Sequence, residues 1–165
     1  MSSSNDNKSI NSATPFHFVI LPGIVNTFFP TICGNSSIIL ANIIEEFPQI
    51  VGKKVLTIPG RITKWKGVAE FIDLLSLLDD NYHGLVVGPT AKSKKKYLNK
   101  LQYKVSSLNL EDKITFTGSR RDIANIYKIS DVVFNLSQTP EPFGRTMIEA
   151  IAVSYTHLTL PTIFA

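Results

Sequence analysis

Apolar and polar residues follow two different periodicities along the chain from Val55 onward. Short apolar runs that end in turn residues predict buried strands at 55–58, 85–87, 114–116 and 131–136. Longer stretches with apolar residues at helical spacing predict helices that begin near residue 67, cover 98–108 and 122–129, and run from about 143 to 153. The repeated strand–helix order predicts an α/β fold, namely a Rossmann-like parallel sheet with helices on both faces and ligands at the carboxyl ends of its strands.

The segment before these repeats is less regular. It predicts a serine-capped helix at 36–47 and a strand at 18–21. Residues 1–15 are rich in Ser and Asn and have neither the basic start nor the apolar run of a signal peptide, so they predict a disordered leader. Prolines and a glycine interrupt the apolar stretch 16–33, which argues against a membrane-spanning helix of about 20 residues. The expected domain covers residues 16–153.

Composition narrows the class of protein. The chain has 165 residues and is 44% hydrophobic, which fits one globular domain with a single core. Its lone cysteine, Cys33, excludes an internal disulfide framework and a cysteine-rich metal site, so we expect a reducing, cytoplasmic location. The net charge is +4, and six of the seventeen basic residues fall between Lys92 and Lys104. This local excess suits nucleic acid, an anionic membrane surface or a phosphorylated small ligand.

One candidate site lies at residues 59–67, between the end of a predicted strand and the start of a predicted helix. Arg61 can donate two parallel hydrogen bonds to phosphate oxygens, and Lys66 supplies a mobile point charge. The free N–H groups at the helix start favour the same anion. The segment therefore matches a diphosphate, although a solvated basic turn is an equally good interpretation of these nine residues alone.

A second candidate site lies at residues 140–149, again after a strand and at the start of a helix. Glu141 stands between two prolines, so a stiff loop can aim it at a ligand, and Glu149 projects from more than a turn into the helix. Carboxylates accept hydrogen bonds from the paired hydroxyls of a sugar or ribose, and N–H groups near Gly144 can meet a phosphate. Taken singly, each glutamate is more simply interpreted as an exposed surface residue.

Together and in this order, the two segments resemble the donor-binding domain of the retaining glycosyltransferases of family 4. The resemblance covers residues 19–153 and rests on five successive motifs, at 60–67, 84–88, 116–118, 131–133 and 141–149. It implies the C-terminal, Rossmann-like half of a two-domain GT-B enzyme that transfers a hexosyl group from a nucleotide-diphosphate sugar with retention.

The resemblance also assigns roles to residues. Arg61 and Lys66 would hold the donor diphosphate and stabilise charge on the leaving group, and Glu141 would face the transferred sugar; these are the expected catalytic residues. Glu149 would accept hydrogen bonds from the ribose hydroxyls.

Further contacts follow from the same resemblance. Backbone groups at Phe143 and Gly144 would meet the sugar or phosphate, and Arg120 would lie beside the base. The family needs no nucleotide-binding metal in this domain and no other cofactor. The sequence agrees with that expectation, since its histidines are scattered and show no metal-ligand spacing.

The chain departs from the family at both ends. From Ser154 onward it resembles translated adapter sequence, so we expect residues 154–165 to be a non-native tail, in which 158–164 can imitate a missing strand. Residues 22–26 stand where the family has an Arg-Gly-aliphatic-Asp run. No acceptor-binding N-terminal domain is expected within the chain, and such a fragment alone should be inactive.

Two alternatives remain open at this point. A nucleotide-sugar 2-epimerase would share the GT-B fold and bind the donor with carboxylates. Alternatively, the lysine stripe (Lys92, Lys94, Lys95, Lys96, Lys100 and Lys104) makes a non-enzymatic module that binds anionic membrane or nucleic acid. A solvated helix face explains the stripe more simply than either ligand. The expected partners are thus a nucleotide sugar and an acceptor-binding domain, with peripheral contact at the inner face of the membrane left open and nucleic acid not expected.

Overall fold

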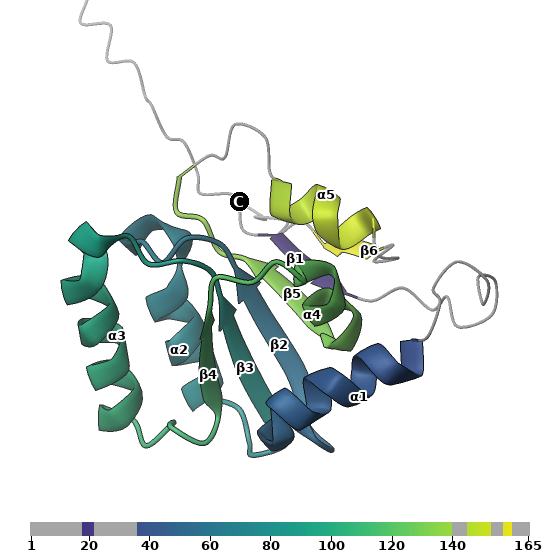
Figure 1. Cartoon of the computed structure of the whole chain (residues 1–165). Helices are drawn as coiled ribbons and strands as arrows, with labels where there is room; N and C mark the ends of the chain where they lie inside the picture. The colour runs from purple at the N-terminus through teal and green to yellow at the C-terminus, as the bar shows by residue number, and fades with distance from the viewer. Residues whose placement is uncertain (1–17, 22–35, 140–144, 153–156, 160–165) are drawn as a thin grey trace, which may run out of the picture.

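The fold is a single mixed sheet flanked by helices (Figure 1). The computed structural model describes residues 18–21, 36–139, 145–152 and 157–159. In that part, the strands are β1 (Phe18–Leu21), β2 (Lys54–Pro59), β3 (Tyr82–Val87), β4 (Ile114–Gly118), β5 (Val132–Asn135) and β6 (His157–Thr159). The helices are α1 (Ser36–Glu46), α2 (Val68–Ser76), α3 (Lys95–Ser107), α4 (Ile123–Ile129) and α5 (Arg145–Ala152), with short 3₁₀ turns η1 (Pro48–Ile50), η2 (Lys64–Lys66) and η3 (Lys92–Lys94).

Four strands form the parallel part of the sheet, as the strand–helix repeats predict. β2 pairs in parallel with both β3 and β5, and β3 pairs in parallel with β4. In the order β4-β3-β2-β5-β1-β6, the chain runs outward from β2 to β4 and then returns to β5 on the other side of β2, so the crossover helices α2 and α3 fall on one face and α4 on the other. The predicted α/β fold with helices on both faces is confirmed.

The two outer strands differ from a fully parallel arrangement. β1 is antiparallel to β5, and β6 is antiparallel to β1. No strand–helix–strand unit links β1 to β5, so nothing in the connectivity requires them to run in the same direction; an antiparallel edge on a parallel sheet is common. β6 lies within the predicted non-native tail, in which the sequence at 158–164 predicts an imitation of a missing strand.

Apolar residues on the two faces of the sheet form two separate cores. α2 and α3 cover one face, where their apolar stripes pack on Leu56, Ile58, Val86 and Phe134. Helices α1 and α4 cover the other face, over Val55, Leu85 and Val87. Alternation along β2 and β3 thus sends neighbouring side chains to opposite cores, which is why these strands are buried at nearly every position.

Polar contacts fix the register of β2 against β5. The Asp131 carboxylate accepts hydrogen bonds from Val55 N (2.7 Å) and Lys54 Nζ (2.9 Å). Deeper in the sheet, the Thr57 and Ser130 hydroxyls are buried and lie 2.7 Å apart. A slip of one residue would separate the two buried hydroxyls, so these contacts hold β2 and β5 in register.

Candidate functional site

Turns at the carboxyl ends of β2, β3 and β4 are bonded side to side. Gly60 N donates to Val87 O and Gly88 N donates to Gly118 O, both at 2.8 Å. Gly88 has φ +154°, and a Cβ at this position would lie 1.9 Å from the carbonyl oxygen of Gly60. Only glycine permits this approach of two backbones. The result is a flat floor of backbone atoms at the sheet edge.

A pocket of about 450 Å³ opens above this floor and extends to α4 and α5. Its walls come from segments far apart in the sequence: the turn after β2, the loop after β4 and the first turns of α5. Its lining includes Gly60, Arg61, Gly88, Ser119, Arg120, Tyr127, Arg145, Thr146 and Glu149. This edge pocket lies at the carboxyl end of the sheet, where open α/β folds bind their ligands.

Arg61, Lys66 and Arg145 form a cation cluster at the edge pocket. Arg61 and Arg145 are exposed and line it. The half-buried Lys66 side chain runs beside Gly60, with Nζ 3.8 Å from the position that a Cβ would take there, and lies over the Trp65 ring at 4.6 Å. Burial lowers the pKa of the Lys66 ammonium, and the charges of Arg61 and Arg145 lower it further. Cations held this close repel each other, so the cluster favours an anion.

Glu149 is the acidic residue in the lining of the edge pocket. It lies on α5, one turn beyond Arg145, and is exposed. Its Oε2 accepts a weak hydrogen bond, 3.3 Å long, from the hydroxyl of Tyr127, whose side chain is fully buried. The carboxylate therefore keeps most of its acceptor capacity for a ligand. The edge pocket offers an anion site and a hydroxyl-binding carboxylate within one hollow.

Arg120 lines the edge pocket, but its guanidinium is already engaged. It forms ion pairs with Glu46 of α1 and with Asp122, which it meets at 2.7 Å. It also lies over the Phe47 ring, 5.4 Å from the centroid. These hydrogen bonds, first to Glu46 and then to Asp122, raise the pKa of Arg120 above its ordinary value. The structure thus gives Arg120 a role in joining α1 to α4, and its expected place beside the base stays a prediction.

Among the other predicted site residues, the structure brings Arg61 and Glu149 into the lining of the edge pocket and places Lys66 beside it, against Gly60. Glu141, Phe143 and Gly144 lie outside the described residues. Sequence reasoning missed Arg145 and Tyr127. Arg145 carried a usable signal, because a cation at the first residue of a helix opposes the helix dipole and so indicates an anion nearby.

Two features are absent from the described residues. In those ranges, no three His, Cys, Asp or Glu side chains are grouped to hold a metal ion. Nor does any helix in them have the length and apolar character needed to span a bilayer.

Comparison with known proteins identifies the family. A sequence model of the family described as glycosyl transferases group 1 matches residues 41–160. The chain belongs to this family. The glycosyltransferase prediction is therefore confirmed at the level of the family.

Known relatives of this group 1 glycosyl transferase chain are longer than it is. Mannosylfructose-phosphate synthase from Agrobacterium fabrum is 39% identical over 109 residues, which cover 61% of this chain and 24% of the synthase. Anabaena HepE, solved in complex with UDP and glucose, superposes with a TM-score of 0.66 at 27% identity, over 70% of this chain and 31% of HepE. A glycosyltransferase from Rickettsia africae superposes with a TM-score of 0.65 at 32% identity, over 69% of this chain and 30% of the Rickettsia protein. The chain thus spans less than a third of each relative.

Proposed function

We propose that the edge pocket binds the nucleotide-diphosphate sugar of a retaining glycosyltransferase of family 4, of the hexosyltransferase type. The observation that carries the proposal is that the cation cluster and a largely unengaged carboxylate, Glu149, come together at one hollow at the carboxyl edge of the sheet. A donor of this class has both matching parts, a diphosphate and vicinal ribose hydroxyls. The HepE structures in complex with UDP and with UDP-glucose support the same ligand class.

Within this proposal, the cation cluster acts through charge. When the bond to the transferred sugar breaks, negative charge builds on the departing nucleotide diphosphate. Cations fixed beforehand in a partly buried site stabilise that charge with little reorganisation. Arg61 presents a fork of N–H donors, and Lys66 adds a point charge against Gly60. We keep Glu141 as the residue that orients the transferred sugar, with Phe143 and Gly144 supplying backbone contacts.

The described residues form one sheet domain, and transfer in a GT-B enzyme needs a second domain for the acceptor. We therefore propose that this chain alone binds donor and completes transfer poorly, with residues 16–153 as the binding unit and 154–165 as a non-native tail.

A 2-epimerase would use the same donor contacts. Product analysis of the complete protein separates the two: an epimerase releases an altered nucleotide sugar without an acceptor.

The test is titration calorimetry of the full chain with UDP, GDP and ADP. We expect at least one nucleoside diphosphate to bind, and Arg61→Ala to weaken it by about 1.5–3 kcal/mol while leaving the nucleoside nearly unaffected. Lys53→Ala is a matched control, since Lys53 lies at the opposite end of β2. Failure of the folded chain to bind any of the three nucleotides would refute the proposal.

A further inference from the structure

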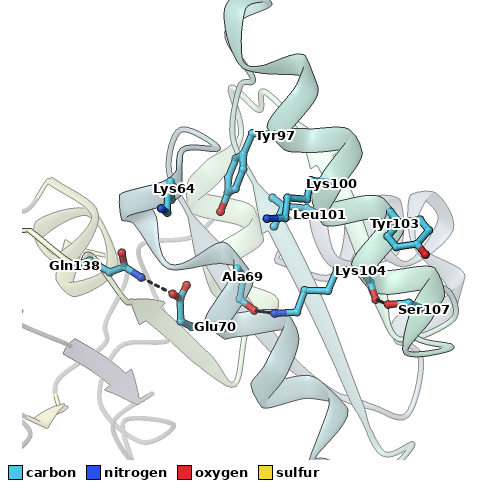
Figure 2. Close-up of a pocket in the computed structure, with 10 residues that line it drawn as sticks. All are labelled: Lys64, Ala69, Glu70, Tyr97, Lys100, Leu101, Tyr103, Lys104, Ser107 and Gln138. Atoms are coloured by element: carbon cyan, nitrogen blue, oxygen red, sulfur yellow. Dashed lines mark hydrogen bonds between the residues drawn. The ribbon is translucent and has the colours of Figure 1, made fainter.

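A second hollow lies between α2 and α3 and is separate from the edge pocket. It measures about 360 Å³, within the range of roughly 300–1,000 Å³ typical of small-molecule sites. Figure 2 shows that η2, α2 and α3 supply most of its walls, and that Gln138 approaches from the loop after β5. We call it the α2–α3 groove and define it by Lys64, Glu70, Tyr97, Lys100, Leu101 and Gln138.

Two lysines of the α2–α3 groove are without an anionic partner in the part of the chain that the structure describes. Neither Lys64 nor Lys100 forms an ion pair there. Their neighbour Lys104 is different, because its ammonium meets Asp73 Oδ2 at 2.6 Å and Ala69 O at 3.0 Å. Lys104, although part of the lysine stripe, therefore uses its charge in a contact within the protein. Positive charge in the groove is left on Lys64 and Lys100, on opposite walls.

The rest of the α2–α3 groove combines an apolar floor with hydroxyl-binding groups. Leu101 is buried in the floor, and the half-buried Tyr97 ring stands over it (Figure 2). Burial, and then the charge of Glu70, raises the pKa of the Tyr97 hydroxyl, which therefore stays a neutral donor. The Gln138 amide donates to the Glu70 carboxylate, so their remaining donor and acceptor atoms are held at the groove rim.

We propose that the α2–α3 groove is a second binding site, which takes a phosphorylated saccharide. The phosphate would lie between Lys64 and Lys100, whose ammonium groups supply point charges from two sides. The apolar face of a sugar ring would pack on Tyr97, and its hydroxyls would meet Glu70 and Gln138. An apolar surface with a few fixed polar groups is the usual composition of a small-ligand site.

Segment 60–67 links this groove to the edge pocket. Lys64 lines the groove and Lys66 lies against Gly60, which lines the edge pocket, so the η2 turn lies between the two sites. The loop that carries Gln138 is tied to the same turn, since Gln138 N donates to Trp65 O at 2.7 Å. A phosphate held by Lys64 would therefore restrain the turn that positions the cation cluster. If the edge pocket binds nucleotide as proposed above, each ligand should alter the affinity for the other by the same factor.

The experiment is titration of the full chain with glucose 6-phosphate, glucose and inorganic phosphate, followed by amide NMR shifts and calorimetry. We expect glucose 6-phosphate to bind more tightly than either fragment and to shift the amides of residues 97–104. Lys100→Gln and Lys64→Gln should each weaken it about tenfold. Lys96→Gln is the matched control, because Lys96 is an exposed lysine of α3 outside the groove, and it should bind as wild type.

Arg61→Ala separates this proposal from the nucleotide proposal. It should leave glucose 6-phosphate binding unchanged; loss of binding in Arg61→Ala but not in Lys100→Gln would show that the sugar phosphate enters the edge pocket and would overturn the inference. Equal binding by Lys100→Gln and wild type, with both folded by circular dichroism, would also overturn it. Binding to anionic vesicles that depends on Lys100, without any response to glucose 6-phosphate, would assign the groove to a membrane surface instead.

Discussion

Replacing Arg145 with glutamine tests the edge pocket at the residue that sequence reasoning missed. Arg145 is exposed, lines the pocket and begins α5, so the substitution removes a charge without opening a cavity in the core. A charge-assisted hydrogen bond to phosphate is worth about 1.5–3 kcal/mol. Arg145→Gln should therefore weaken UDP binding by about 10- to 150-fold.

The same substitution should not destabilise the protein without ligand. The Arg145 charge lowers the pKa of Lys66, which means that the folded chain keeps like charges close together. A cation at the first residue of α5 also opposes the helix dipole. Removing it relieves both effects, so the free energy of unfolding should stay unchanged or rise by a few tenths of a kcal/mol.

UDP affinity is expected to fall while stability stays the same or rises, so measuring both distinguishes a binding role from a structural one. Calorimetry with UDP and urea unfolding are measured on the same samples, and Arg121→Gln serves as the matched control because Arg121 is exposed and does not line the pocket. A structural role for Arg145 would lower stability and leave the affinity of the folded chain intact. Unchanged UDP affinity, or a loss of stability above about 1 kcal/mol, would refute the reasoning.

Three further predictions use the same measurements. Glu149→Gln should cost about 1–2 kcal/mol in nucleotide binding with little change in melting temperature, and should discriminate less between UDP and its 2′-deoxy form; wild-type discrimination in the variant would contradict ribose contact. Gly88→Ala places a Cβ 1.9 Å from the carbonyl oxygen of Gly60 and should destabilise the fold by about 3 kcal/mol or more in urea unfolding, whereas a small loss would show that the turns can separate. Burial lowers the pKa of His83 to about 4 in the folded protein. As pH falls, the unfolded chain therefore takes up a proton on His83 before the folded chain does. The stabilisation is complete above the ordinary histidine pKa, and the free energy of unfolding should fall by about 2 kcal/mol between pH 7 and pH 5. His83→Gln, which can keep the bond to Thr115, should lose less over the same interval, and an identical pH dependence would show that His83 does not titrate.

The central strands and the helices that follow them were predictable because each segment shows one clear pattern of hydrophobic positions. β2 and β3 are buried at nearly every position, since their alternate side chains enter two different cores. The helix stripe beginning at Val68 is buried at the spacing that the sequence shows. The antiparallel β1 was not predictable, because its direction depends on pairing with β5, far along the chain, and not on any local pattern.

The candidate site was predictable only in part, for a related reason. Arg61 and Glu149 stand after strands, where connectivity alone brings them to one edge. The ion pairs of Arg120 depend on where α1 crosses the sheet, which no motif encodes. The α2–α3 groove likewise needs the packing of two helices against a loop from β5 before Lys64 and Lys100 face each other.

Positive charge at this edge has a structural cost that binding can offset. Two helices that begin there carry cations where acidic residues would favour the dipole, since Arg145 begins α5 and Lys95 begins α3, whereas the first turn of α2 has the acidic Glu70. Such an arrangement lowers the stability of the free chain, and nothing in either hydrophobic core requires it. An anion at the edge would remove the repulsion and add charge-assisted bonds at once. The free energy that the fold gives up in its unliganded state is therefore recovered on binding, as expected where charge is placed to bind a ligand and not to stabilise the fold.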